Sequence, residues 1–159
     1  MSVVGIDPGT HRVGYAFLQG DRRTPRLVVA ETIAITRGRS ASERLAELEQ
    51  ELTERLKRDR PSAVAIEKLF FTKNTKTAIA VAEARGIMLL TAARHVPSIW
   101  EYTPSEVKLA VTGYGRADKL QVHRMIRALF PKEELPLGDD AIDAIAIALT
   151  AIYQAPPMS

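Results

Sequence analysis

Cysteine is absent from this sequence of 159 residues. Its absence excludes disulfides, thiolate catalysis and zinc ribbons, and it fits a protein of the reducing cytoplasm. Long apolar runs are missing as well, because the longest, over residues 144–153, is too short to cross a bilayer. The first apolar run is interrupted by Asp7 after only a few residues, so no signal peptide is expected. These absences together predict a cytoplasmic protein.

Charge of one sign is not in large excess either. There are 22 Lys and Arg against 19 Asp and Glu, a formal net charge of +3. This modest excess favours a polyanionic partner without identifying one, with nucleic acid ahead of a membrane surface. With 46% hydrophobic and 26% charged residues, the composition is that of one domain with its own core. We expect a single domain over residues 1–155 and a short tail over residues 156–159.

The first part of the chain has the pattern of hairpin-linked strands followed by a crossover. Segments rich in β-branched and aromatic residues, separated by turn sequences, predict antiparallel strands at residues 3–6, 12–18 and 27–35. A Ser-x-x-Glu capping box and leucines at helical spacing then predict a surface helix that ends before Pro61. Residues 63–66 return as a short apolar strand, which should lie parallel to an earlier strand because a crossover precedes it.

The second part of the chain is mainly helical in pattern. A strand is expected at residues 99–102, and Pro104 then stands at the first turn of a helix, where proline is tolerated. The final helix, over residues 140–153, is apolar nearly all round and should be buried. Further helices are expected at residues 78–92 and 120–130. The order of elements predicts an α/β fold in which helices flank both faces of a five-stranded mixed sheet.

The first predicted strand ends abruptly in the sequence GIDPGT at residues 5–10. Three interpretations are open: a phosphate-binding turn as in actin-like ATPases, a metal-binding carboxylate, or a simple Asp-Pro-Gly turn. Actin-like proteins need a second lobe with another phosphate-binding turn, and this chain has neither the length nor a second such motif. Pro8 disfavours helical backbone at Asp7 and Gly9 turns the chain away, which would leave the carboxylate at the sheet edge.

Four acidic residues are predicted to meet at one edge of the sheet. Asp7 and Glu67 each end a strand, and if these strands are parallel neighbours, both side chains emerge at the carboxyl edge, where open α/β sheets bind ligands. Asp140 and Asp143 lie three residues apart in the first turn of the final helix and so share a face. Taken singly, these acids have ordinary explanations as a turn residue, a strand-end charge, a helix cap and a dipole partner. Two separate strands that each end on an acid favour a common site.

Crowded carboxylates repel one another unless a cation compensates them. Mg²⁺ prefers carboxylate oxygens and suits a cluster that contains neither histidine nor thiol, and Mn²⁺ accepts the same ligands. Two such ions about 4 Å apart can activate a water and stabilise the leaving oxygen of a phosphodiester. The sequence therefore predicts metal-assisted hydrolysis. The expected ligands are Asp7, Glu67, Asp140 and Asp143, with the adjacent Asp139 as the helix cap.

Four stretches carry a resemblance to a known family: GIDPGTHRVGYA, AIEKLFFTKNTKTAIAVAEARG, YTPSEVKLAVTGYGRADKLQV and DDAIDAIAIAL. In this order, and over nearly the whole chain, they resemble the successive signatures of the RuvC Holliday junction resolvases. The resemblance implies a ribonuclease H-like fold, a homodimer, and magnesium-dependent nicking of four-way DNA junctions in recombination and repair. It also implies that the four acids are the catalytic metal ligands and that a branch-migration helicase complex is a possible partner.

The resemblance implies roles for basic and aromatic residues too. Lys119 would assist at the scissile phosphate, with Lys108 nearby and Arg116 as a weaker phosphate contact. Phe70 would stack on bases opened at the crossover. Three residues that follow it, Lys73, Asn74 and Lys76, could follow a DNA backbone or could equally form a polar loop. No metal spacing or acid partner is evident for His11, His95 and His123, so no catalytic role is expected of them.

Two alternatives remain beside a junction resolvase. A YqgF-type ribonuclease H-like nuclease shares the opening motif and acts on RNA, but the region around Phe70 and the segment from Val107 to Lys119 resemble RuvC instead. A non-catalytic junction-binding dimer would be indicated by loss of an acid, and none is lost. The dimer surface cannot be located from periodicity, although the small residues Ala78, Ala82 and Ala84 would allow close helix packing.

Overall fold

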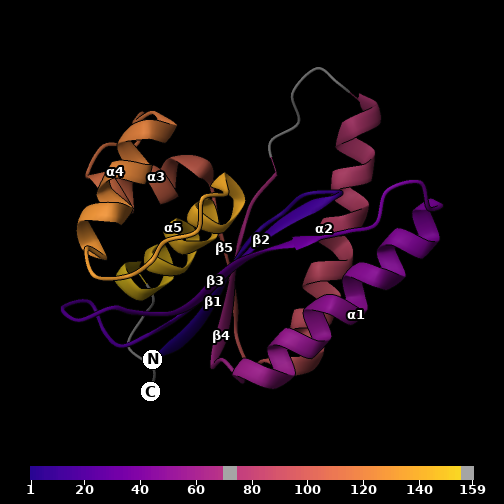
Figure 1. The fold of residues 1–159 in the computed structure, drawn as a ribbon, viewed down its shortest axis with the longest axis horizontal. Helices are drawn as coiled ribbons and strands as arrows, with labels where there is room; N and C mark the ends of the chain where they lie inside the picture. The colour runs from indigo at the N-terminus through magenta and orange to yellow at the C-terminus, as the bar shows by residue number, and fades with distance from the viewer. Residues whose placement is uncertain (70–74, 155–159) are drawn as a thin grey trace.

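A five-stranded sheet runs through the centre of the protein (Figure 1). The structure is a computed structural model that describes residues 1–69 and 75–154, without the side chains of Thr75 and Lys76. The strands, in the order β3-β2-β1-β4-β5 across the sheet, are β1 (Ser2–Asp7), β2 (Arg12–Gln19), β3 (Arg26–Ala34), β4 (Ala63–Glu67) and β5 (Ile99–Tyr102). The helices are α1 (Ala41–Asp59), α2 (Thr75–His95), α3 (Pro104–Thr112), α4 (Lys119–Leu129) and α5 (Asp139–Gln154).

The pairing of the strands makes the sheet mixed, as the sequence predicts. β2 pairs antiparallel with both β1 and β3, whereas β4 lies parallel to β1 and to β5. In the register of β1 and β4, Ile6 is opposite Ile66, so the next residue of each strand, Asp7 and Glu67, stands at the same carboxyl edge. The predicted crossover is confirmed, and it is the parallel pairing that brings these two acids together.

Local sequence signals set the starts of three helices. Ser40 caps α1, Thr103 caps α3 and Asp118 caps α4, and each forms a capping box with the third residue of its helix. Gly113 ends α3 in the left-handed conformation, at φ 76°, which glycine adopts without the usual steric cost. The loop from Gly113 therefore separates α3 from α4 where the sequence predicts a break.

The helices form a layer on each face of the sheet (Figure 1). One apolar cluster lies between the sheet and α1 with α2, and the other lies between the sheet and α3, α4 and α5. Alternate residues of β1 supply the two clusters, since Val3 faces one and Val4 the other. Helix α5 is buried along most of its length, as its all-round apolar sequence predicts.

Helix α5 lies unusually close to the sheet because two strand residues have no side chain. A Cβ at Gly5 would overlap the carbonyl oxygen of Ala144, and a Cβ at Gly14 would overlap that of Asp140. Each glycine thus leaves space for the backbone of α5. The close approach determines how near the first turn of α5 lies to Asp7.

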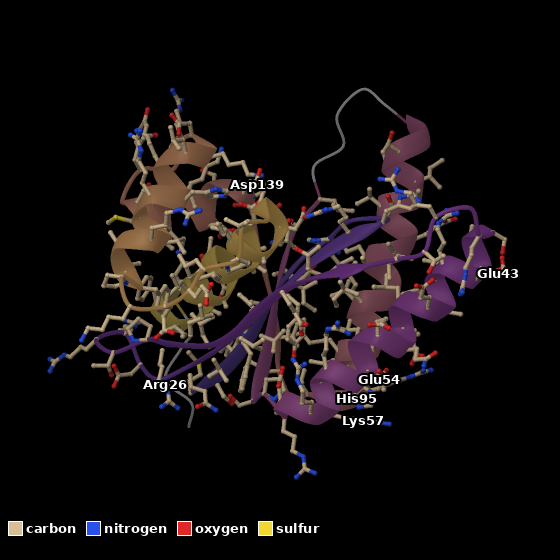
Figure 2. All side chains as sticks on the ribbon, in the orientation of Figure 1. Arg26, Glu43, Glu54, Lys57, His95 and Asp139 are labelled. Atoms are coloured by element: carbon tan, nitrogen blue, oxygen red, sulfur yellow. The ribbon has the colours of Figure 1, made fainter. Side chains whose placement is uncertain are left out.

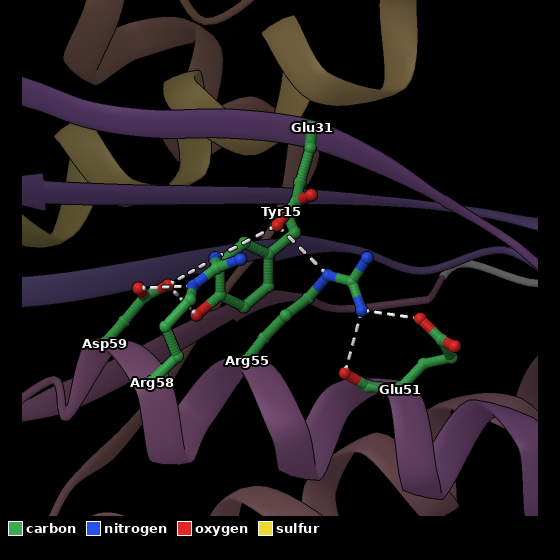
Figure 3. A network of polar contacts seen from close by, with 6 residues as sticks. All are labelled: Tyr15, Glu31, Glu51, Arg55, Arg58 and Asp59. Carbon is green, nitrogen blue, oxygen red and sulfur yellow. Dashed lines mark hydrogen bonds and ion pairs between the residues drawn. The ribbon is translucent and has the colours of Figure 1, made fainter.

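A polar network joins α1 to the hairpin strands β2 and β3 (Figure 3). The hydroxyl of the fully buried Tyr15 on β2 donates to Asp59 at 2.7 Å. Glu31 on β3 accepts from both Arg55 and Arg58, at 3.0 Å each. The contact with Asp59 gives the buried hydroxyl of Tyr15 a hydrogen-bond partner.

Among residues 1–69 and 75–154, none of the helices combines the length and the apolar character needed to span a membrane.

Candidate active site

A cavity of about 270 Å³ opens at the carboxyl edge of the sheet. Its polar lining comes from Asp7 on β1, Glu67 on β4, Lys108 on α3, Lys119 on α4 and Asp143 on α5. Val107, Val122 and Ala146 contribute apolar walls, together with Pro104. Five separate elements therefore meet here, and three of the four predicted acids face one space.

The carboxyl group of Asp7 has the most perturbed pKa in the cavity, about 8. Burial is the main cause, and the negative charges of Asp143, Glu67 and Asp140 raise it further. The positive charge of Lys119 acts in the opposite direction. Burial also raises the pKa of Glu67, with a contribution from Asp143 that Lys108 partly offsets. In the absence of a cation, ionisation of Asp7 is thus strongly disfavoured.

The fourth acid, Asp140, does not line this cavity; its carboxylate instead contacts the guanidinium group of Arg12 on β2. Its Oδ2 lies 2.7 Å from Nε of Arg12. Asp143 pairs with a lysine, since its Oδ2 lies 3.0 Å from Nζ of Lys119. Burial lowers the pKa of Lys119, but its contacts with Asp143 and Asp139 outweigh this effect, so the net shift is upward. Lys119 and Arg12 therefore neutralise two of the four acids.

Two expectations drawn from the sequence, for His123 and Asp139, are corrected by the structure. His123, for which no acid partner was evident, has its Nε2 2.9 Å from Oδ1 of Asp143. The two residues are twenty positions apart in sequence and on different helices, so no spacing rule could have paired them. Asp139, expected as the helix cap, is instead the first residue of α5, and its Oδ2 lies 3.3 Å from Nζ of Lys119. Figure 2 shows Asp139 at the start of α5, far from Arg26 and His95.

Arg85 on α2 is a further residue near the cavity, and no motif or spacing in the sequence singles it out. Its Nε donates to the backbone carbonyl of Glu67 at 3.0 Å, and its guanidinium also pairs with Glu101 on β5. The side chain is only 15% exposed. Arg85 thus anchors the end of β4, where Glu67 leaves the sheet.

The remaining predicted DNA contacts fall in different places. Arg116 is exposed in the loop before α4, close in sequence to Lys119. Three of the predicted contacts, Phe70, Lys73 and Asn74, lie outside the described residues, as does the side chain of Lys76. Of the small residues considered for dimer packing, Ala84 is wrong for that role, because this residue of α2 is buried in the core of the protein.

The donor set of the cavity is suited to a hard divalent cation. The acids offer only carboxylate oxygens, which Mg²⁺ and Mn²⁺ prefer. Burial, and after it the charges of the neighbouring acids, raise the pKa of Asp7, and a bound cation would oppose this shift. Over residues 1–69 and 75–154, no three acidic or histidine side chains stand close enough to form a finished ligand set.

The fold has clear counterparts among solved structures. The T. thermophilus RuvC structure in complex with a Holliday junction substrate matches with a TM-score of 0.89 and 35% identity, covering 98% of this chain and 94% of that one. The yeast mitochondrial Holliday junction resolvase Ydc2 matches with a TM-score of 0.69 at 15% identity, covering 95% of this chain and 77% of that one, and this likeness concerns the fold alone. The sheet and its acidic edge thus define the class: a ribonuclease H-like α/β protein of the nuclease type.

Sequence comparison narrows the class to one family. The family model for the crossover junction endodeoxyribonuclease RuvC matches residues 3–151. The protein of that name from Moorella thermoacetica is 45% identical over 98% of this chain and 93% of its own length. The chain belongs to the RuvC family.

Proposed function

We propose that the cavity at the carboxyl edge of the sheet is where this protein, a crossover junction endodeoxyribonuclease, hydrolyses phosphodiester bonds of Holliday junctions. The observation that carries the proposal is the meeting of Asp7, Glu67 and Asp143 around one cavity beside Lys119. The reaction is nicking of two symmetry-related strands of a four-way junction during homologous recombination and DNA repair.

We infer that Asp7, Glu67, Asp140 and Asp143 bind two Mg²⁺ ions, for which Mn²⁺ can substitute. When bound, these ions would supply Lewis acidity, which lowers the pKa of a water and stabilises the leaving oxygen of a phosphodiester. Support comes from the all-oxygen donor set and from the raised pKa of Asp7, which a cation would relieve. Asp7 is held by its strand and by Pro8, so its carboxylate needs little reorganisation to act as a ligand.

Two lysines are placed to bind the phosphate that is cut. Lys119 and Lys108 approach the cavity from different helices and line it together with the acids. An ammonium group here can orient a phosphate oxygen and stabilise the negative charge that develops on it. We propose Lys119 as the catalytic one, because it contacts Asp143 directly at 3.0 Å, and Lys108 as a second phosphate contact.

We propose that the DNA extends from this cavity along further basic and aromatic residues. Arg116 lies in the exposed loop that leads to Lys119. In the sequence after Glu67, we assign Phe70 to base stacking and Lys73, Asn74 and Lys76 to the DNA backbone. These assignments rest on the family resemblance and the sequence, and the branch-migration helicase rests on that resemblance alone.

We propose that the protein acts as a homodimer through the outer face of α2. Ile79 and Leu90 are 62% and 48% exposed, and eleven residues, or three helical turns, separate them, so they lie on one face. A second copy related by a two-fold axis would cover this apolar face. The dimer would then have two cavities, one for each of the two DNA strands that are nicked. In sedimentation velocity, Ile79→Ser with Leu90→Ser should give a monomer. The control Leu137→Ser, which removes a 95% exposed leucine outside α2, should remain dimeric; equal mass for all forms would contradict the assignment.

The direct test of the function is cleavage of a labelled synthetic four-way junction, with linear duplex and RNA as controls. Wild-type protein should make paired symmetric nicks in the junction only when Mg²⁺ or Mn²⁺ is present, and Asp7→Asn should make none. Lys119→Ala should cut at least about 100-fold more slowly. Full activity of Asp7→Asn would exclude the proposed site. Binding of the junction without cutting would favour a structural junction binder, and cleavage of RNA with the junction intact would favour a YqgF-type activity.

A further inference from the structure

Two side chains of α4 hold the two oxygens of Asp143 separately. His123 reaches Oδ1 through Nε2 at 2.9 Å, and Lys119, one helical turn earlier, reaches Oδ2 through Nζ at 3.0 Å. An ionised carboxylate only accepts hydrogen bonds, so the imidazole donates from Nε2. The carboxylate of Asp143 is therefore fixed in rotation as well as in position.

The imidazole itself is held firmly. Its side chain is 12% exposed, and α4 carries it on a helix that packs into the core through Val122 and Ile126. The other ring nitrogen, Nδ1, lies 3.7 Å from Oδ1 of Asp139. The ring thus lies between two carboxylates at the start of α5, those of Asp139 and Asp143. Of these two, Asp139 is the more exposed.

We propose that His123 is a positioning residue, which holds Asp143 by Oδ1 so that Oδ2 remains directed toward Lys119 and the cavity. Asp139 is the outer partner of His123 and Lys119 in this arrangement and is not a metal ligand. The proposal rests on the proposed function, because it assumes that Asp143 binds the metal. A hydrogen bond from a neighbouring side chain to a ligating carboxylate fixes its orientation, and loss of such a bond typically weakens metal affinity by about 10–100-fold.

The test compares His123→Ala with His123→Gln, since a glutamine amide can donate to Asp143 from a similar place. The control is Met125→Ala, because Met125 lies on the same helix and is 41% exposed. Free Mn²⁺ is measured by electron paramagnetic resonance on DNA-free protein, and cleavage is measured with kcat separated from KM for the junction. Thermal unfolding verifies that each variant is folded.

We expect His123→Ala to weaken Mn²⁺ binding by at least about tenfold and to lower kcat with KM unchanged. His123→Gln should recover most of both losses, and Met125→Ala should behave as wild type. The positioning role is overturned if folded His123→Ala binds Mn²⁺ as wild type does, or if His123→Gln is no better than His123→Ala. Asp143→Asn separates the two levels: if it binds metal and cuts normally, the proposed function has failed, whereas its loss beside a normal His123→Ala refutes only the role of His123.

The role of Asp139 is tested against its neighbour in the same experiments. Asp139→Asn should retain Mn²⁺ binding within about threefold of wild type, because an asparagine oxygen can still contact Lys119. Asp140→Asn should lose binding to a much larger extent, as expected of a ligand. Equal losses for the two variants would overturn the assignment of Asp139 as the outer partner.

Discussion

Gly14 pairs with Asp7 across β1 and β2, and the space left by its missing side chain is occupied by the backbone of Asp140. The contact joins the end of β1 to the first turn of α5. Two of the candidate ligands are thus brought together by a residue that has no functional group of its own.

Gly14→Ala should therefore disable the site while leaving every acid in place. The added Cβ would overlap the carbonyl oxygen of Asp140 and push the start of α5 away from the sheet. Overpacking of this kind typically costs about 1–3 kcal/mol of unfolding free energy. Junction cleavage should fall by at least about tenfold even at temperatures where the variant is fully folded. Gln19→Ala, at the far end of the same strand, is the control, and normal cleavage by Gly14→Ala would show that the close approach is not required.

The pKa of Asp7 predicts how stability depends on pH in the metal-free protein. The group has a pKa of about 3.9 in an unfolded chain and about 8 in the folded protein. Between these values the folded state binds a proton that the unfolded state has lost, so the unfolding free energy falls as pH rises, by at most about 1.4 kcal/mol per pH unit from this group. Asp7→Asn removes this loss. Its stability relative to wild type should rise from pH 5 to pH 8 and then level off.

The measurement is urea unfolding in EDTA across this pH range. Asp21→Asn is the control, because hydrogen bonds from the backbone of Thr24 and Arg23 lower the pKa of Asp21, so its difference from wild type should stay constant above pH 5. A difference between Asp7→Asn and wild type that does not change with pH would contradict the prediction.

The hydrogen bond between Tyr15 and Asp59 should contribute to stability without affecting cleavage. It lies on the α1 side of the sheet and joins β2 to the end of α1 (Figure 3). Tyr15→Phe removes one hydrogen bond to a charged acceptor, so the unfolding free energy should fall by about 1–2 kcal/mol. Junction cleavage by the folded variant should match wild type. Tyr114→Phe, at an exposed position, should change neither quantity, and no loss of stability in Tyr15→Phe would show that Asp59 is equally well satisfied by Arg58.

Arg85→Met should lower cleavage through Glu67. The substitution keeps much of the volume but removes the donor to the Glu67 carbonyl, so the end of β4 loses its anchor to α2 and β5. We expect a decrease in kcat of about tenfold. Arg94→Met, near the exposed end of the same helix, should retain full activity. If both variants cut equally well, Arg85 has no part in holding Glu67.

Much of the fold could be predicted from the sequence because its signals are local. The capping box at Ser40, the glycine that ends α3 and the all-round apolar pattern of α5 each act within a few residues, and all three predictions are confirmed. The crossover before β4 predicted that this strand lies parallel to an earlier one, and its pairing with β1 confirms the common edge expected for Asp7 and Glu67 if their strands were neighbours. The sequence by itself therefore determined the order of elements and which acids could meet.

Tertiary packing alone decided how those acids are held. The contact of His123 with Asp143, that of Arg12 with Asp140 and that of Arg85 with the backbone of Glu67 each join residues on different elements. No periodicity encodes such contacts, because they depend on the distance and rotation at which helices lie on the sheet. The glycines that allow the close approach of α5 appear in the sequence only as gaps in an apolar strand, and their role emerges once the helix backbone occupies the space that they leave.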